Sequence, residues 1–407
     1  MKTINKKSVN HCSNEEYNDH CLICESDQLE EIVEFAALSR ITSDCRPFPS
    51  GGRLAVCKGC GAVQKYPDKN WLSDIDLIYS QYSAYFQADG DEQIILDSRT
   101  GAIRRRSDVI LERMTESIDL PANGKALDIG CGSGVTLSAL NKVLPGWELY
   151  GQDLDKRNEQ RLETNPGFVE LFECTPENIP GQYDLITLIH SLEHFPSPSG
   201  LLKTILTKLS PGGILLVEVC NTMQNPYDLL IADHLTHFSD SSLKLIAENS
   251  GFVVDVVETD WVSKELSMIA INSEHSLKVK KNILSDSENI VAFVHDQISW
   301  LLAMKHAAEL ASNTSDRFGI FGTSICATWL AGVLGDRVSF FVDEDPSRQG
   351  KEYMGKRIEA PQQIDANSKV YMALIPEIAD KISARIGDLP MELVLPPSYT
   401  SLGNSPS

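Results

Sequence analysis

Basic residues and long apolar stretches are scarce in this sequence. Lys and Arg number 36 against 57 Asp and Glu, which gives a formal net charge of -21. Because a nucleic acid demands a dense cationic surface, we expect no nucleic-acid partner. No apolar run approaches the roughly 18 residues of a membrane helix, and the first residues lack the apolar stretch of a secretory signal. These absences favour a cytoplasmic protein without a membrane partner.

The 407-residue chain is longer than the roughly 250–300 residues at which a single core usually stops growing, so we expect several domains. We distinguish an irregular segment at 1–66, a helical segment at 67–120, a strand and helix segment at 121–280, a connecting helix at 281–314, a smaller α/β unit at 315–398 and a flexible tail at 399–407. Short apolar runs that alternate with amphipathic ones predict an α/β fold with a mostly parallel sheet.

Periodicity also predicts the individual elements. The first sheet should contain five strands, at 125–130, 148–154, 168–173, 183–190 and 213–219. Two further apolar runs, at 251–257 and 267–272, predict a pair of closing strands. Apolar residues at helical spacing predict a long helix at 287–312. Four later runs predict a second sheet, at 317–322, 338–343, 370–375 and 391–396.

A glycine-rich turn follows the first predicted strand. Asp128 ends this strand, and glycine occupies every second position after it, at Gly130, Gly132 and Gly134. Glycine lets the backbone approach a ligand closely, and the helix that follows offers unpaired N–H groups. Asp153, about 20 residues further on, ends the next strand and can accept both hydroxyls of a ribose. The two signals predict a cofactor that contains adenosine.

The spacing D-x-G-x-G-x-G differs from the dinucleotide fingerprint and resembles the first motif of the class I S-adenosylmethionine-dependent methyltransferases. The resemblance implies that the glycine loop holds the methionine part of S-adenosylmethionine (SAM) and that Asp153 holds the ribose. It also implies cofactor contacts for Thr175, where the family commonly has Asp, and for His190 at the end of the fourth strand. The alternative is a tight structural turn in another α/β protein.

Two C-x-x-C pairs lie in the first segment, one formed by Cys21 and Cys24 and the other by Cys57 and Cys60. Each pair can place two thiolates at one side of a metal ion, and four thiolates complete a closed tetrahedral zinc site. A closed site has no open position for water, so the predicted Zn²⁺ is structural. Ordinary reduced cysteines and a redox dithiol are the alternatives.

The three parts of the chain together resemble the zinc-containing sugar C-methyltransferases, which act on nucleotide-activated deoxysugars. Matching pieces lie at 57–64, 233–239, 342–350 and 355–358. The resemblance implies a small zinc-binding domain, a Rossmann-like methyltransferase core and a C-terminal Rossmann-like domain that binds no dinucleotide. It also implies a sugar-nucleotide substrate. In that family a base removes the proton beside a 4-keto group, and the enolate carbon then takes the methyl group.

The family has a Tyr-x-Glu-His cluster after the fifth strand, and this chain has Ile231, Asp233 and His234 at the corresponding positions. We therefore predict His234 and Asp233 as catalytic residues. His194, after the fourth strand, is a second candidate. A histidine beside an acid can act as a base or can orient a substrate hydroxyl, and a structural histidine is the third interpretation.

Tyr79 and Tyr82 are candidates to cover the substrate and supply the phenol that Ile231 lacks. With Tyr85 they lie at helical spacing, which is equally typical of a core stripe. His237 is interpreted as structural, at the start of a helix. The basic run 104–106 could meet a pyrophosphate, although a solvated surface is the favoured interpretation.

Three functions remain in competition. The leading prediction is C-methylation of a nucleotide-linked 4-keto sugar. The second is an O- or N-methyltransferase of the same architecture, acting on a polysaccharide or natural-product intermediate, and the absent Tyr supports it. The third is a non-catalytic scaffold that keeps the cofactor fold, and the intact glycine loop speaks against it.

Overall fold

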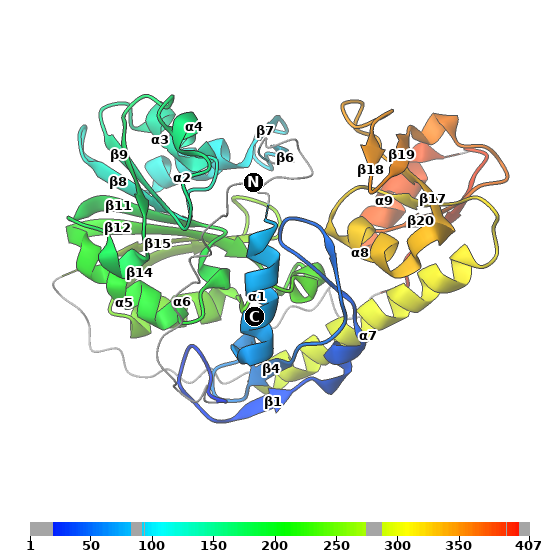
Figure 1. The fold of residues 1–407 in the computed structure, drawn as a ribbon, viewed down its shortest axis with the longest axis horizontal. Coiled ribbons are helices and arrows are strands. Elements are labelled where there is room, and N and C mark those ends of the chain that lie inside the picture. The colour runs from blue at the N-terminus through cyan, green and yellow to red at the C-terminus, as the bar shows by residue number, and fades with distance from the viewer. Residues whose placement is uncertain (1–18, 83–91, 93, 274–286, 388, 399–407) are drawn as a thin grey trace, which may run out of the picture.

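The computed structural model describes residues 19–82, 92, 94–273, 287–387 and 389–398 (Figure 1). Tyr85 and the tail predicted at 399–407 lie outside the described residues. Figure 1 shows a large sheet with its helices on the left and a smaller α/β unit at the upper right. The N-terminal strands lie below, and the long helix α7 (Ser287–Ser312) joins them to the smaller unit.

Seven strands form the sheet of the large unit. They are β8 (Lys125–Ile129), β9 (Glu148–Asp153), β10 (Phe168–Glu173), β11 (Tyr183–Ile189), β12 (Leu209–Cys220), β14 (Val253–Glu258) and β15 (Glu265–Ile271). Their order is β10-β9-β8-β11-β12-β15-β14, and β15 alone runs in the direction opposite to that of the other six strands. The strand order reverses between β8 and β11, and open α/β sheets bind ligands at the carboxyl ends of the strands beside such a point.

All seven predicted strands are confirmed. The largest difference is at β12, which begins at Leu209 and not at 213. The N–H of Gly212 donates to the carbonyl of Asn272 at 2.8 Å, so the residues before 213 already join the ladder with the last strand. Apolar residues fill the inner strands because helices cover both faces of the sheet.

Helices pack on the two faces of this sheet. They are α2 (Arg106–Ser117), α3 (Val135–Val143), α4 (Glu159–Leu162), α5 (Pro198–Lys208) and α6 (Asp240–Asn249). One apolar cluster joins α2 and α3 to the sheet, and a second joins α5 and α6 to it. Ser239 caps α6 through a reciprocal hydrogen bond with Ser242, which fixes where the chain leaves the preceding strand.

The segment at 67–120 is only partly helical, which corrects the prediction. Between α1 (Lys69–Ser80) and α2 the chain forms an antiparallel hairpin of β6 (Ile94–Leu96) and β7 (Ile103–Arg105). The buried carboxylate of Asp97 accepts hydrogen bonds from the backbone of Arg99 and the hydroxyl of Thr100, and it pairs with Arg104 and Arg113. A buried carboxylate with four partners stabilises this turn against a continuous helix.

The N-terminal segment is built from short strands and one single turn of helix. It contains β1 (Leu29–Glu31), η1 (Val33–Ala37), β2 (Arg40–Ile41), β3 (Pro47–Phe48), β4 (Leu54–Cys57) and β5 (Val63–Lys65). The fourth strand of its sheet, β13 (Thr236–His237), comes from the large unit and pairs with β5. His237 therefore lies in a strand that precedes the helix, and the cysteine-bearing segment is joined directly to the loop that carries His234.

The helix predicted at 287–312 is confirmed as α7, and the second sheet follows it. That sheet contains β16 (Phe318–Phe321), β17 (Val338–Val342), β18 (Glu352–Tyr353), β19 (Lys356–Glu359), β20 (Lys369–Met372) and β21 (Glu392–Val394), with helices α8 (Ile325–Leu334) and α9 (Pro376–Ile386). Its strand order is β18-β19-β17-β16-β20-β21. Within the described ranges, none of the helices has the length and apolar character needed to cross a bilayer.

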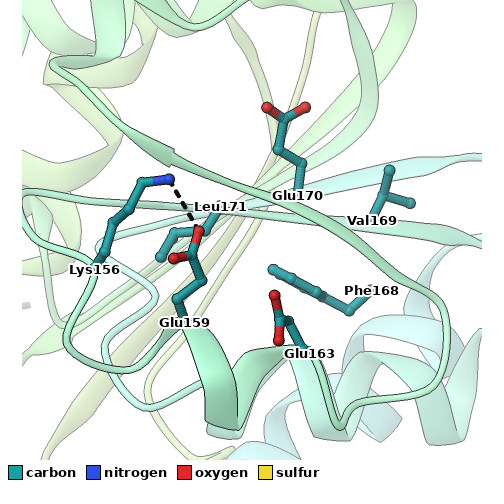
Figure 2. Close-up of a pocket in the computed structure, with 7 residues that line it drawn as sticks. All are labelled: Lys156, Glu159, Glu163, Phe168, Val169, Glu170 and Leu171. Carbon is teal, nitrogen blue, oxygen red and sulfur yellow. Dashed lines mark hydrogen bonds and ion pairs between the residues drawn. The ribbon is translucent and has the colours of Figure 1, made fainter.

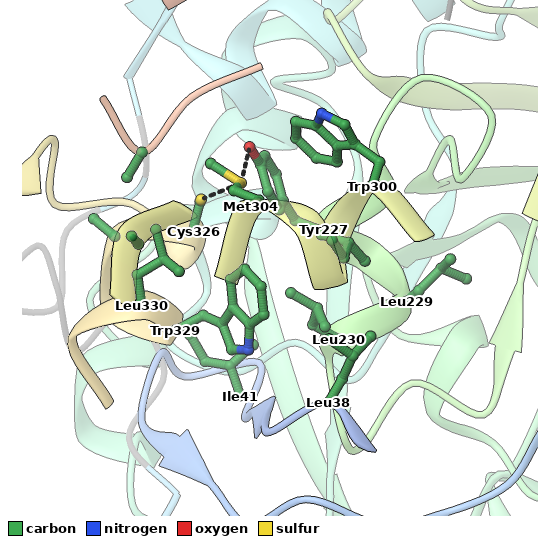
Figure 3. Close-up of a cluster of buried hydrophobic side chains, with 14 of the residues drawn as sticks. Leu38, Ile41, Tyr227, Leu229, Leu230, Trp300, Met304, Cys326, Trp329 and Leu330 are labelled. Atoms are coloured by element: carbon green, nitrogen blue, oxygen red, sulfur yellow. Dashed lines mark hydrogen bonds between the residues drawn. The ribbon is translucent and has the colours of Figure 1, made fainter. Parts of the chain in front are cut away.

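A single apolar cluster connects the N-terminal segment, α7 and the C-terminal unit (Figure 3). Leu38 and Ile41 come from the first, Met304 from the second and Trp329 from the third, and all four are fully buried. The indole N–H of Trp329 donates to the carbonyl of Ser39 at 2.8 Å. The C-terminal unit is thus packed onto the loop that follows η1.

Candidate functional site

The glycine loop between β8 and α3 has the backbone geometry that only glycine adopts easily. Gly132 and Gly134 have φ of 50° and 81°. A Cβ at Gly134 would lie 2.3 Å from the side chain of Leu162, whereas at Gly132 the nearest atom would be a backbone oxygen 4.0 Å away. Gly134 is therefore required for packing, and Gly132 leaves open space above the loop.

The two acids of the cofactor motif lie at different depths. Asp153, at the end of β9, accepts from the N–H of Gly132 at 3.0 Å and from that of Leu154 at 2.7 Å. Asp128 is buried and accepts from the hydroxyl of Thr187 at 2.6 Å, and its burial raises its pKa to about 7. Asp128 thus lies beneath the loop and ties β8 to β11, whereas Asp153 lies at its surface.

Unpartnered polar atoms line this loop. The hydroxyls of Ser133 and Ser191 are buried, and neither has a hydrogen-bond partner among the described residues. A Cβ at Gly130 would lie 3.1 Å from the Cβ of Ser191, so this serine faces the loop. Buried polar groups without partners are costly unless a ligand or water satisfies them. The loop therefore fits a polar ligand such as the methionine part of SAM.

Thr175 is exposed and lies immediately before the 3₁₀ turn η3 (Pro176–Asn178), after β10. Its hydroxyl accepts from the amide of Asn178 at 3.1 Å. The amide of Gln152 donates to the carbonyl of Cys174 at 2.6 Å, and this bond fixes the loop next to the glycine turn. The loop that carries Thr175, which is predicted to contact the cofactor, thus lies beside the end of β9.

His190 follows β11 in a left-handed backbone conformation, with φ of 49°. Its Nε2 lies 2.8 Å from the guanidinium of Arg106 and 3.0 Å from Glu265, and its Nδ1 lies 3.4 Å from Glu193. Although burial and Arg106 favour the neutral ring, the two glutamates raise the pKa of His190 to about 9. Backbone strain of this kind concentrates at functional sites.

The basic run at 104–106 is the solvated surface that we favoured only at Arg105, which is exposed. Arg104 pairs with Asp97 and Glu112, and Arg106 is buried against His190. The sequence did not indicate these contacts, because the groups that bind Arg104 and Arg106 lie in other elements.

His234 and Asp233, which are adjacent in sequence, do not pair with each other. Asp233 is fully buried and accepts from the N–H of Ser43 at 2.8 Å. His234 instead places its Nδ1 2.7 Å from Asp228, in the 3₁₀ helix η5 (Pro226–Leu230). His194, in the 3₁₀ helix η4 (Leu192–His194), packs edge-on against the His234 ring with centroids 4.7 Å apart. The structure thus brings the two histidine candidates together.

Asp228 is a site residue that the sequence reasoning missed. It lies six positions before His234, in an irregular turn, where no regular spacing indicates a contact. Glu193 was also missed, although it stands between two candidate positions in His-Ser-Leu-Glu-His. Its side chain is 2 % exposed, and its carboxylate forms an ion pair with Nδ1 of His190 at 3.4 Å.

Tyr79 lies beside these histidines, with its ring centroid 6.4 Å from that of His194. It makes an edge contact with Tyr82, whose carbonyl accepts from Arg157 at 2.6 Å. Burial raises the pKa of Tyr79 well above its ordinary value, so its phenol remains a hydrogen-bond donor. The indole of Trp71 in α1 donates to the carbonyl of Ala232 and holds this helix on the histidine loop.

The four cysteines predicted to bind zinc lie together. Their sulfur atoms are all within 4.8 Å of one another. The distance between Cys21 and Cys60 is 3.5 Å, and that between Cys24 and Cys57 is 3.6 Å. A tetrahedral ion with Zn–S bonds of about 2.3 Å separates its sulfurs by about 3.8 Å. The donor set and its spacing fit such an ion.

A surface hollow of about 260 Å³ lies between α4 and β10 (Figure 2). Its lining is acidic and apolar, with one lysine, and consists of Lys156, Glu159, Glu163, Phe168, Val169, Glu170 and Leu171. None of these residues is a predicted site residue. The hollow is therefore separate from the glycine loop and the histidine cluster.

The sheet order, the antiparallel β15 and the glycine loop together define a class I methyltransferase fold. Residues 101–257 match the family model described as "Methyltransferase domain". This part of the chain thus carries a methyltransferase domain, and the predicted class I methyltransferase fold is confirmed.

Similar proteins include the ubiquinone biosynthesis O-methyltransferase of Burkholderia ambifaria, which is 31% identical over 112 residues, 26% of this chain and 48% of the relative. The protein of that name from Proteus mirabilis is 26% identical over 167 residues, 39% of this chain and 64% of the relative. The chain thus spans about half the length of the curated relatives it matches. Human N-acetylserotonin methyltransferase, solved with SAM, shows 16% identity and a TM-score of 0.36, covering 41% of this chain and 52% of that one.

Proposed function

We propose that this chain methylates a nucleotide-linked 4-keto sugar at the carbon next to the ketone. SAM, when bound, supplies an electrophilic methyl group. The residues proposed to hold it are the loop glycines and Asp153. Ser133 and Ser191 are proposed as further donors, since their hydroxyls have no hydrogen-bond partner among the residues that the structure describes. Thr175 is proposed to contact the adenine of SAM. His190 is proposed to contact SAM from the end of β11.

The observation that carries the proposal is the environment of His234. Asp228 holds its Nδ1, which leaves Nε2 as the ring nitrogen for a substrate proton. Burial favours the neutral ring, but Asp228, Glu193 and Asp233 together raise the pKa of His234. Removing a proton from carbon needs a stronger base than methylating a hydroxyl group does. The three carboxylates around His234 make it a stronger base and therefore support C-methylation.

The phenol absent from the family motif has a replacement from another element. Ile231 is buried in the apolar cluster shared with α7, and its side chain offers no polar atom. Tyr79 lies next to His194, and its raised pKa keeps it as an O–H donor. We propose that this phenol stabilises the enolate oxygen, a role that preorganised donors perform best.

The test is deuterium exchange at the carbon next to the ketone. Without SAM, the full chain in D₂O should exchange the hydrogen on that carbon of a 4-keto sugar nucleotide for deuterium. When SAM is present, it should add a methyl group to the same carbon. His234→Asn should lower both rates at least about 100-fold and leave SAM affinity unchanged. A bound sugar nucleotide that shows no exchange contradicts the proposal.

The second candidate is O-methylation, because the curated relatives are named O-methyltransferases. In that case His194 and His234 would orient and neutralise an acceptor hydroxyl. An O-methylated product with no exchange at carbon favours this candidate over the first.

We further propose that Cys21, Cys24, Cys57 and Cys60 hold a structural Zn²⁺. The spacing of the four sulfurs supports this, and the burial of three of them supports a closed site.

A further inference from the structure

A buried chain of polar contacts leads from the cysteine-bearing segment to His234. Lys65, at the end of β5, lies 3.1 Å from Nε2 of His237. Nδ1 of His237 lies 2.8 Å from one carboxylate oxygen of Asp228, and the other oxygen lies 2.7 Å from His234. All four residues are at most 4 % exposed. The contacts therefore occur away from solvent, where each donor must meet an acceptor.

Counting protons assigns a direction to each bond in this chain when Lys65 is charged. The Lys65 ammonium has three N–H groups and three acceptors, the carbonyl of Ile231 at 2.6 Å, that of His234 at 2.8 Å and Nε2 of His237. Because Nε2 of His237 accepts, its Nδ1 carries the proton and donates to Asp228. Burial lowers the pKa of Lys65 to about 7, although Asp228 and Asp233 oppose that shift, so this count describes the charged amine. The proton on Nδ1 of His237 does not depend on it, because an ionised Asp228 accepts from that nitrogen in either case.

The same count continues through Asp228. One of its oxygens already accepts from His237 and from the hydroxyl of Thr222. An ionised carboxylate only accepts, so its other oxygen requires a proton on Nδ1 of His234. In the neutral ring of His234 the lone pair must then lie on Nε2, which is the nitrogen that does not contact Asp228.

We infer that Lys65, His237 and Asp228 are positioning residues that fix the tautomer and orientation of His234. This inference rests on the proposed function, in which His234 is the base. In this inference the N-terminal segment contributes to catalysis as well as to folding, because β5 supplies Lys65, the first residue of the series that leads to His234.

Charged groups face His234 from several elements. Asp228 approaches from η5, Glu193 and His194 from η4, Cys220 from β12, and His237 from β13, while Asp233 is its neighbour in sequence. Lys65 reaches its carbonyl from β5. Removing the negative charge of Asp228 therefore lowers the pKa of His234, and the acid limb of the pH profile should move to lower pH.

The direct test reads the tautomer in the full chain. Histidine labelled with ¹⁵N, assigned by comparison with a His234→Gln sample, should show in alkaline buffer a protonated Nδ1 and an unprotonated Nε2 for His234. His237 should show the same tautomer. A proton on Nε2 of His234 overturns the inference. This reading needs no substrate, so it separates failure of the inference from failure of the proposed function.

The kinetic test compares Asp228→Asn with Asp240→Asn, a change at the exposed first residue of α6. Asp228→Asn should lower kcat about 100-fold or more, move the acid limb of the profile to lower pH and leave SAM affinity intact. Asp240→Asn should change none of these. A folded Asp228→Asn protein with the wild-type pH profile contradicts the inference, and if the variant does not fold, the tautomer measurement decides.

Discussion

Gly132 and Gly212 both adopt a left-handed backbone, with φ of 50° and 76°, yet only Gly132 lies in the loop predicted to bind the cofactor. A Cβ at either position meets no close neighbour. The pair therefore separates the cost of backbone strain from the cost of blocking a ligand.

At this scale we predict that Gly132→Ala and Gly212→Ala each destabilise the fold by about 1–2 kcal/mol, the penalty for a non-glycine residue in this region. Only Gly132→Ala should weaken SAM binding, by at least about tenfold, because its Cβ projects into the open space above the loop. Urea unfolding and calorimetric titration with SAM measure the two effects. Equal SAM affinity in both variants would remove Gly132 from the cofactor site.

At the scale of elements, the cysteine cluster joins the end of β4, the turn before β5 and the chain before β1. Cys57 ends β4, Cys60 lies in the turn before β5, and the other two cysteines come from the chain that precedes β1. Because β5 then pairs with β13, the cluster sits at one end of the sheet that supports the histidine loop. Loss of the proposed Zn²⁺ should therefore disturb the position of His234 as well as the N-terminal segment.

We predict that the purified chain contains about one zinc ion per molecule and that Cys24→Ser loses it. The variant should melt at least about 5 °C lower, since metal-binding free energy contributes to folding. Cys174→Ser, at a cysteine outside the cluster, is the matched control and should keep its zinc. Elemental analysis and thermal unfolding give both quantities. Full zinc content in Cys24→Ser would disprove the assignment.

At the scale of the whole molecule, the packing around α7 makes the C-terminal unit part of the support for the candidate histidine cluster. Trp329 packs in the shared apolar cluster and bonds to Ser39. Four residues later in the chain, Ser43 binds the carboxylate of Asp233 next to the histidines. The C-terminal unit thus stabilises a loop that touches the histidine cluster.

We predict that Trp329→Ala costs about 3–5 kcal/mol of unfolding free energy, as expected for a large buried aromatic side chain. Leu310→Ala on α7, where the side chain is 55% exposed, should cost less than about 0.5 kcal/mol. Urea unfolding followed by circular dichroism compares them. A loss below about 1 kcal/mol for Trp329→Ala would mean that the two units are not joined through this core.

The sequence by itself determined the elements and the cofactor motif, because both depend on local patterns. Apolar periodicity predicted the seven strands of the large sheet and α7, and the glycine spacing predicted the turn that Gly132 and Gly134 form. The C-x-x-C pairs predicted a cluster of four sulfurs, which the fold brings together. Each of these signals lies within a few consecutive residues.

Only the tertiary structure decided which charged groups meet. Adjacency in sequence favoured Asp233 as the partner of His234, but the chain turns so that Asp233 binds Ser43 and Asp228 binds the histidine. Lys65 reaches the same cluster from 169 positions away. Hydrogen bonds between distant elements leave no periodic trace in a sequence, because only the folded backbone sets the distances over which such bonds form.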